Sequence, residues 1–309
     1  MTTITEGLAV DGTAVVRIEN AFLQVDVAPG VGGRIVNCLE KRTGHQFLWH
    51  NKSLLLERLP PGSEYDPNFY GGIDDLIPND IPESVDGVAY ADHGELWTTP
   101  MLHGVKGDVL HLEGILPLSQ LYYTKRVGLR PDSPRLDLDY RVENRSGATR
   151  RFMWKLHAAL NVEPGDTVVC PARTARVSDL QWSRWHTLDP FRWPVIEGNW
   201  VDQIPPADGT CDFFYLYDLE AGQISWESTA RGLKFGFEFD TAVFPFAWLF
   251  ASYGGLLGYY TVVLEPCSGM PLSVNEAAKL GQCSQLEPGE YIETRVTICA
   301  GPTGKNAVR

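Results

Sequence analysis

The sequence lacks the signals of membrane-spanning, secreted and nucleotide-binding proteins. It has no uninterrupted apolar run of the roughly 18 residues that a membrane-spanning helix needs. Residues 1–7 form neither the basic n-region nor the apolar h-region of a secretion signal. It also has no Walker loop, no glycine-rich dinucleotide loop after a strand, no Gly-x-Ser-x-Gly elbow and no His-Glu-x-x-His pair. We therefore expect a cytoplasmic protein without nucleotide, serine-hydrolase or zincin chemistry.

Positive charge is in short supply. The 26 Lys and Arg residues are outnumbered by 39 Asp and Glu residues, which gives a formal net charge of -13. A surface with this excess of negative charge repels nucleic-acid phosphates and anionic lipid headgroups. We expect neither a nucleic-acid partner nor a membrane partner.

The six cysteines include no pair with Cys-x-x-Cys spacing, so neither a zinc knuckle nor a redox pair is indicated. Their even number is compatible with disulfides. A chain of 309 residues can, however, bury enough core to be stable without them. We expect free thiols.

Period-two alternation, the pattern of a strand with one buried and one solvated face, is abundant. Apolar and polar residues alternate over residues 136–143, 233–240 and 292–299. Aromatic or β-branched runs occupy residues 22–27, 109–113, 122–127 and 259–264. The 30 glycines and 21 prolines leave little room for long helices, although short helical turns are expected near residues 275–280.

These patterns predict an all-β fold, a large antiparallel β-sandwich. Strands do not alternate with helices, as an α/β fold requires, and no internal repeat indicates a propeller. Residues 190–209 are rich in proline and aromatics, which favours a functional loop over the sheet rather than a domain linker. We expect one domain over residues 1–309.

Two histidines and a glutamate are candidate catalytic residues. His93 lies in the polar stretch 92–97, which is either a functional turn or a polar loop anchored by buried Trp97. Alternation places His157 on the open face of a strand, where an imidazole suits general acid catalysis, although a lone strand histidine is more often structural. Glu265 ends an apolar strand, so it is either a desolvated general base or an exposed carboxylate.

Four of the nine tryptophans lie between residues 182 and 200. Aromatic rings stack on the apolar C–H faces of sugars, and Trp185 is the candidate for such a contact. A hydrophobic lid packed on the sheet explains the same cluster.

Five segments, in order along the chain, resemble the galactose mutarotase-like family, which comprises the aldose 1-epimerases and their hexose-phosphate mutarotase relatives. The segments are residues 25–35 with 41–45, the Gly-Gly-Ile turn at 71–78, the His-Gly pair at 93–94, the strand at 152–161, and residues 263–271 followed by 286–290. The resemblance spans nearly the whole chain and implies a β-supersandwich with an open sugar-binding groove.

The resemblance also implies a reaction and its residues. Glu265 takes the proton of the anomeric hydroxyl and His157 protonates the ring oxygen, so that the ring opens, rotates and recloses on the other face. This interconversion of anomers needs no cofactor and no metal, and its partner is a small-molecule carbohydrate. The expected substrate-binding residues are His93, Asp74, Asp75, Tyr70, Trp97 and Trp185.

Two departures from the family pattern bear on the substrate. Tyr70 stands where the phosphate-sugar relatives carry an arginine before Gly-Gly, and Trp97 stands where their His-Gly motif ends in arginine. Without these guanidinium groups a phosphate loses its clamp, so we expect a neutral sugar or glycoside. Asp74 and Asp75 would bind sugar hydroxyls, unless they are an ordinary solvated pair on a turn.

The same departures leave two other functions open. His93, His157 and Glu265 are a common ligand set for a divalent metal, as in a metal-dependent sugar isomerase or lyase. A carbohydrate-binding protein without turnover is the third hypothesis. The sequence is compatible with a monomer or a homodimer.

Overall fold

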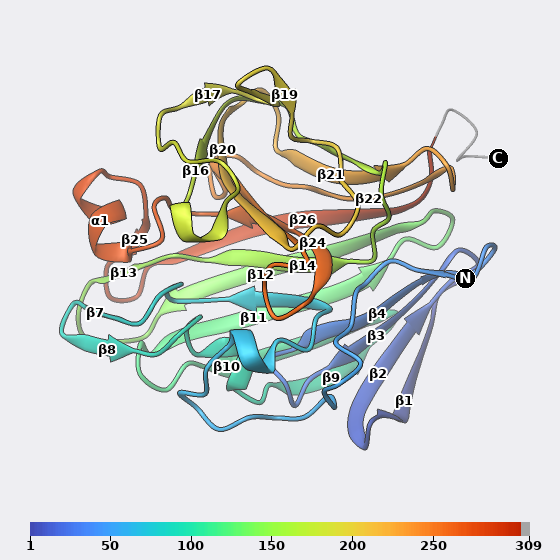
Figure 1. Ribbon diagram of the computed structural model, residues 1–309. Coiled ribbons are helices and arrows are strands. Elements are labelled where there is room, and N and C mark those ends of the chain that lie inside the picture. The colour runs from blue at the N-terminus through green and yellow to red at the C-terminus, as the bar shows by residue number, and fades with distance from the viewer. Residues whose placement is uncertain (304–309) are drawn as a thin grey trace.

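Two large antiparallel β-sheets form the body of the molecule (Figure 1). The structure is a computed structural model that describes residues 1–303, so the end of the predicted domain, residues 304–309, lies outside the described residues. The first sheet has twelve strands. In spatial order they are β1 (Thr3–Val10), β2 (Thr13–Glu19), β3 (Leu23–Ala28), β4 (Arg34–Glu40), β6 (Ile73–Leu76), β14 (Lys155–Leu160), β24 (Tyr260–Cys267), β23 (Phe246–Tyr253), β20 (Thr210–Leu219), β16 (Ala172–Val177) and β17 (Phe191–Arg192), with β5 (His45–Gln46) paired to β4.

The second sheet has eight strands and packs against one face of the first. In spatial order they are β15 (Thr167–Val169), β21 (Gln223–Ser228), β22 (Leu233–Glu238), β26 (Tyr291–Pro302), β12 (Arg135–Asn144), β11 (Leu121–Leu129), β10 (Val109–Ile115) and β9 (Leu102–Lys106). Neighbouring strands in both sheets pair antiparallel. The prediction of an all-β antiparallel sandwich is confirmed.

Shorter elements decorate the sandwich. Three strand pairs are β7 (Glu83–Val85) with β8 (Val88–Tyr90), β13 (Arg150–Phe152) with β25 (Ser284–Leu286), and β18 (Val195–Ile196) with β19 (Asn199–Trp200). The helical elements are the 3-10 turns η1 (Asp66–Asn68), η2 (Leu96–Thr98) and η3 (Leu180–Trp182) and the helix α1 (Val274–Lys279). The helical turn expected near residues 275–280 is therefore confirmed; Ser273 caps it by accepting a hydrogen bond from the backbone N–H of Glu276.

The core lies between the two sheets because alternation turns one side of each long strand inward. On β12, Leu136, Leu138, Tyr140 and Val142 are buried, whereas the residues between them are partly exposed. Trp154 is fully buried and stands edge-on to Tyr140 with ring centroids 5.2 Å apart. Full burial of a leucine or valine side chain such as Leu138 or Val142 contributes about 1.5–3 kcal/mol.

Two other expectations can be compared with the structure. All six cysteines are free thiols, as predicted. The segment 190–209 contains β17, which lengthens the twelve-stranded sheet at its β16 edge, and the β18–β19 pair.

Within residues 1–303 there is no helix that has both the length and the apolar character needed to cross a membrane.

Candidate active site

Antiparallel pairing of β14 and β24 brings two predicted residues together. Ala158 on β14 pairs with Leu264 on β24. Because the strands are antiparallel, the residue before Ala158, His157, lies opposite the residue after Leu264, Glu265. Directly opposed side chains have Cβ atoms roughly 4.5–5.5 Å apart. On its other side, His157 pairs with Asp74 of β6. The sheet therefore presents a short row of ionisable groups on one face.

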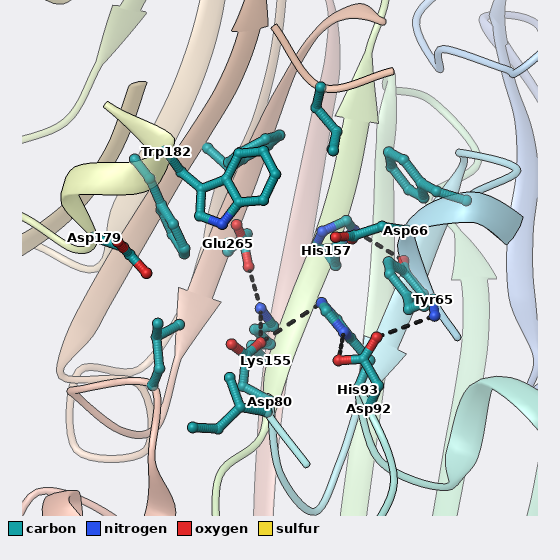
Figure 2. Close-up of a pocket in the computed structure, with 16 residues that line it drawn as sticks. Tyr65, Asp66, Asp80, Asp92, His93, Lys155, His157, Asp179, Trp182 and Glu265 are labelled. Carbon is teal, nitrogen blue, oxygen red and sulfur yellow. Dashed lines mark hydrogen bonds and ion pairs between the residues drawn. The ribbon is translucent and has the colours of Figure 1, made fainter. Parts of the chain in front are cut away.

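Two members of this row, His157 and Glu265, border a cavity of about 190 Å³ on the face of the twelve-stranded sheet that points away from the core (Figure 2). Its walls combine carboxylates, aromatic rings and three basic side chains. The lining residues are Tyr65, Asp66, Phe69, Asp80, Ile81, Asp92, His93, Lys155, His157, Asp179, Trp182, Phe213, Phe250, Leu256, Glu265 and Leu272. In Figure 2, Asp179 stands on one side of Glu265, and Tyr65 and Asp66 stand on the other.

The turn that carries His93 is hydrogen-bonded to the segment that follows β6 and contains Asp80. The backbone N–H of His93 donates to the carbonyl of Asp80 at 2.7 Å, which holds these two residues side by side. Gly94 follows with φ +74°, and a Cβ there would lie 2.3 Å from the carbonyl oxygen of Ile77. Only glycine fits this close approach, so the His-Gly pair is a structural requirement for placing the imidazole.

A chain of alternating charges runs through the cavity. Nδ1 of His93 lies 2.9 Å from Asp92, and Nε2 of His93 lies 3.8 Å from Asp80. Asp80 also pairs with the ammonium of Lys155, which lies 2.8 Å from Oε2 of Glu265 (Figure 2). The two carboxylates and the ammonium are almost completely buried, so these contacts compensate the cost of removing charge from water.

The three candidate residues have shifted pKa values. The pKa of Glu265 is raised because burial penalises its carboxylate more than the Lys155 ammonium favours it. Burial opposes protonation of His93, but attraction to Asp80 and the hydrogen bond to Asp92 outweigh it and raise the pKa of His93. The pKa of His157 falls well below its ordinary value because of burial and of repulsion from Lys155 and His93. His157 is therefore a neutral imidazole at neutral pH, whereas His93 holds its proton more strongly than an ordinary histidine.

His157 is supported from behind by a buried hydrogen-bond network. The Tyr65 hydroxyl donates to Asp74 at 2.7 Å and lies 3.3 Å from Nδ1 of His157. The other oxygen of Asp74 accepts a 2.5 Å hydrogen bond from Nε of the buried Arg34. Tyr65 also stacks on His93 with ring centroids 4.1 Å apart, so one tyrosine orients both imidazoles.

The comparisons with known proteins agree on the architecture. No protein-family model matches the chain, and no curated protein matches it. Among solved structures, a galactose mutarotase-like protein from Clostridium acetobutylicum is 15% identical, with a TM-score of 0.71 over 97% of this chain and 99% of that one. The chain has the galactose mutarotase-like fold.

Two further structures with this fold carry the provisional name aldose 1-epimerase. The protein from Klebsiella pneumoniae is 16% identical, with a TM-score of 0.73 over 96% of this chain and 81% of that one. The protein from Escherichia coli K12 is 18% identical, with a TM-score of 0.69 over 97% of this chain and 99% of that one. At 16–18% sequence identity, the structural similarity to these proteins establishes the mutarotase-like fold.

On this mutarotase-like fold, only some of the predicted site residues meet in the cavity. Glu265, His157 and His93 line it. Asp74 lies directly behind His157, held by Tyr65 and Arg34.

The other predicted binding residues lie elsewhere. Asp75 points into the space between the sheets, where it pairs with Lys125, because successive residues of a strand face opposite sides. Tyr70 and Trp97 line a separate small cavity, and Trp97 is 3% exposed, in keeping with a buried anchor for its loop. Trp185 packs against the core, and Trp182 takes the place in the cavity. Our proposed site therefore omits Asp75, Tyr70, Trp97 and Trp185.

Several cavity residues were missed by the sequence analysis. Lys155 was detectable, since it stands two residues before His157 on the same face of the strand. Asp80 and Asp179 lie in irregular segments. No local sequence pattern predicts that these segments pack beside the sheet and line the cavity. Tyr65 and Asp66 precede the Gly-Gly turn and carry no motif of their own.

The residues proposed as metal ligands do not form a cation site. Within the part of the chain that the structure describes, no group of three His, Cys, Asp or Glu side chains is arranged to hold a metal ion. The ammonium of Lys155 stands between Asp80 and Glu265, where it neutralises both carboxylates. The donor set therefore fits an internal ion-pair chain better than a divalent cation.

Proposed function

We propose that this protein interconverts the anomers of a neutral monosaccharide by acid/base ring opening, as an aldose 1-epimerase does. The observation that carries the proposal is the convergence of Glu265, His157 and His93 on one cavity, with the carboxylate directly opposite a neutral imidazole. Ring opening needs a base at the anomeric hydroxyl and an acid at the ring oxygen, both within reach of one hemiacetal.

Glu265 is the proposed base, and its raised pKa brings it closer to neutrality. The resemblance assigned the acid role to His157, but a proton donor must carry a proton, and the pKa of His157 is lowered. We therefore assign proton donation to His93. Its Nε2 lies 3.8 Å from Asp80, beyond hydrogen-bond distance, which leaves this N–H for a ligand. His157 then hydrogen-bonds the sugar beside Glu265.

The proposed reaction balances without a co-reactant. Glu265 removes the proton from O1 while the C1–O5 bond breaks, a C1–O1 double bond forms, and His93 gives its proton to O5. After rotation about C1–C2, the O5 hydroxyl attacks the other face of C1. Its proton returns to His93, and Glu265 returns a proton to O1.

The cavity wall supports a neutral ligand. None of the described residues that line it is an arginine, so a phosphate has no bidentate partner there. Asp66 and Asp179 stand on opposite sides and offer carboxylate acceptors for sugar hydroxyls, whereas they would repel an anionic sugar. Phe69, Trp182 and Phe250 add aromatic faces on which sugar C–H groups can stack.

The experiment is magnetisation-exchange NMR on a panel of neutral aldoses, each paired with its 6-phosphate where one exists. We expect wild-type protein to accelerate anomer exchange of a neutral aldose and not of its phosphate. Acceleration of the phosphate alone would refute the neutral-sugar assignment, and no acceleration of any sugar would refute the activity.

A further inference from the structure

Lys155 is the buried charge that the proposed reaction leaves without a role. Its side chain is 4% exposed, and its ammonium contacts both Asp80 and Glu265. The ammonium also lies 4.7 Å from the centre of the Trp248 ring, whose face attracts a cation. Two carboxylates and an indole therefore fix the position of this ammonium on the floor of the cavity.

We propose that Lys155 is a positioning residue that holds Glu265 ready to accept a proton and, through Asp80, holds His93 ready to donate one. This inference rests on the proposed function, because it concerns the base and the acid of that reaction. The ion pair engages Oε2 of Glu265 and leaves Oε1 for a sugar hydroxyl.

Glu265 needs such a partner because it is 1% exposed. A carboxylate at this depth keeps its proton unless a cation compensates for the lost water. The titratable and charged groups that face or influence it are Lys155, Asp80, His93, His157, Tyr65 and Cys267. Among these groups, Lys155 has the permanent positive charge, since its two carboxylate partners raise its pKa despite burial.

Asp80 connects the two halves of the proposed machinery. It pairs with Lys155, and it lies 3.8 Å from Nε2 of His93. Without Lys155, Asp80 would still have His93 beside it, but Glu265 would lose the ammonium that contacts it directly and would hold its proton more strongly. A protonated Glu265 cannot accept the anomeric proton.

Lys125, on β11 of the eight-stranded sheet, provides a matched control in the core between the two sheets. It is also buried, bonds Asp75 at 2.6 Å and lies 5.7 Å from the centre of the Tyr140 ring. Replacing Lys125 by Met removes the same kind of ion pair from the core without touching the cavity. Any effect common to both variants therefore reports structural damage.

The test is an NMR titration of the Glu265 side chain in the full-length protein, with isotope-labelled glutamate carboxyls assigned by the loss of one signal in Glu265→Gln. Lys155→Met is expected to raise the pKa of Glu265 by roughly 1–3 units, and Lys125→Met is expected to leave it unchanged. Asp80→Asn, useful if Lys155→Met fails to fold, should shift the pKa of Glu265 and of His93 downward, because Asp80 raises both.

An unchanged Glu265 titration in Lys155→Met, or an equal shift in Lys125→Met, overturns the proposal. The titration does not require turnover, so a protein without anomer exchange would refute the proposed function and leave this test standing. Where exchange is observed, Lys155→Met should move the acidic limb of kcat/KM to higher pH, whereas structural damage alone would lower the rate without moving the limb.

Discussion

Asp74 and Asp75 are neighbours in the chain but belong to different environments, one on each face of the twelve-stranded sheet. Asp74 accepts the Tyr65 hydroxyl hydrogen bond behind His157, whereas Asp75 pairs with Lys125 between the sheets. Strand β6 begins at Ile73, directly after the Gly-Gly turn, and its alternation separates the two carboxylates. One aspartate therefore supports the site and the other supports the core.

This separation predicts a purely structural phenotype for Asp75→Asn. The substitution leaves the Lys125 ammonium buried without its counter-ion, which is expected to cost about 3–5 kcal/mol of folding free energy. Urea unfolding measures that loss, and calorimetric titration of the folded variant should give the wild-type sugar affinity. A variant with native stability and weakened sugar binding would show that Asp75 contacts the ligand.

Trp182 and Trp185 are three residues apart, and only Trp182 lines the cavity. Trp182→Ala should weaken sugar affinity by roughly two- to tenfold, in line with the 0.5–1.5 kcal/mol of an aromatic contact. Trp185→Ala is the matched control and should bind the sugar as wild type does. Equal losses of affinity in both variants would mean that the segment acts as a whole rather than through one indole.

The opposite pKa shifts of the two histidines predict different pH profiles. In wild type, kcat/KM should rise as Glu265 loses its proton, above its ordinary pKa of 4.5, and fall as His93 loses its proton, above 6.5. His93→Asn should remove the alkaline limb and slow exchange at least 10²-fold. His157→Asn should lower the rate and leave that limb in place, because His157 is already neutral.

The reverse result, in which only His157→Asn removes the alkaline limb, would return proton donation to His157. Both variants should be checked for native unfolding midpoints, since Tyr65 contacts both imidazoles.

Asp212 predicts a pH dependence of stability outside the cavity. It is buried on β20 beside Arg184, and burial, partly offset by Arg184, raises its pKa from 3.8 to about 7. Because the folded state binds this proton more tightly than the unfolded state, the stabilisation is full below pH 4 and is lost as pH rises toward 7. Between these two pH limits, the contribution of Asp212 to the free energy of unfolding changes by on the order of 4 kcal/mol. Asp212→Asn should therefore unfold at a higher urea concentration than wild type at pH 8 and should flatten this dependence; an unchanged pH dependence would contradict the assignment.

Alternation explains why the sheets were predictable. Residues 136–143 and 292–299 follow the period of a half-buried strand, and β12 and β26 pair with each other. The same rule placed His157 on the face opposite Leu156, which lies in the core. The pairing of His157 with Glu265 needed the register of β14 and β24, which depends on tertiary structure rather than on either strand alone.

The rest of the cavity was out of reach of local patterns. Asp80, Asp179 and Tyr65 lie in irregular segments, where no period assigns a side chain to a face. Composition made Trp185 a candidate stacking residue, but Trp182 of η3 lines the cavity and Trp185 packs against the core. A sequence pattern thus predicts strands and their faces, and leaves the loops that close a site to the folded structure.

The most direct test of the account is the anomer exchange rate of one neutral aldose, measured by magnetisation-exchange NMR in wild type and Glu265→Gln at equal protein concentration. We predict accelerated exchange in wild type and the uncatalysed rate in Glu265→Gln, with sugar binding retained by the variant. Equal acceleration by both proteins would contradict the assignment of Glu265 as the base.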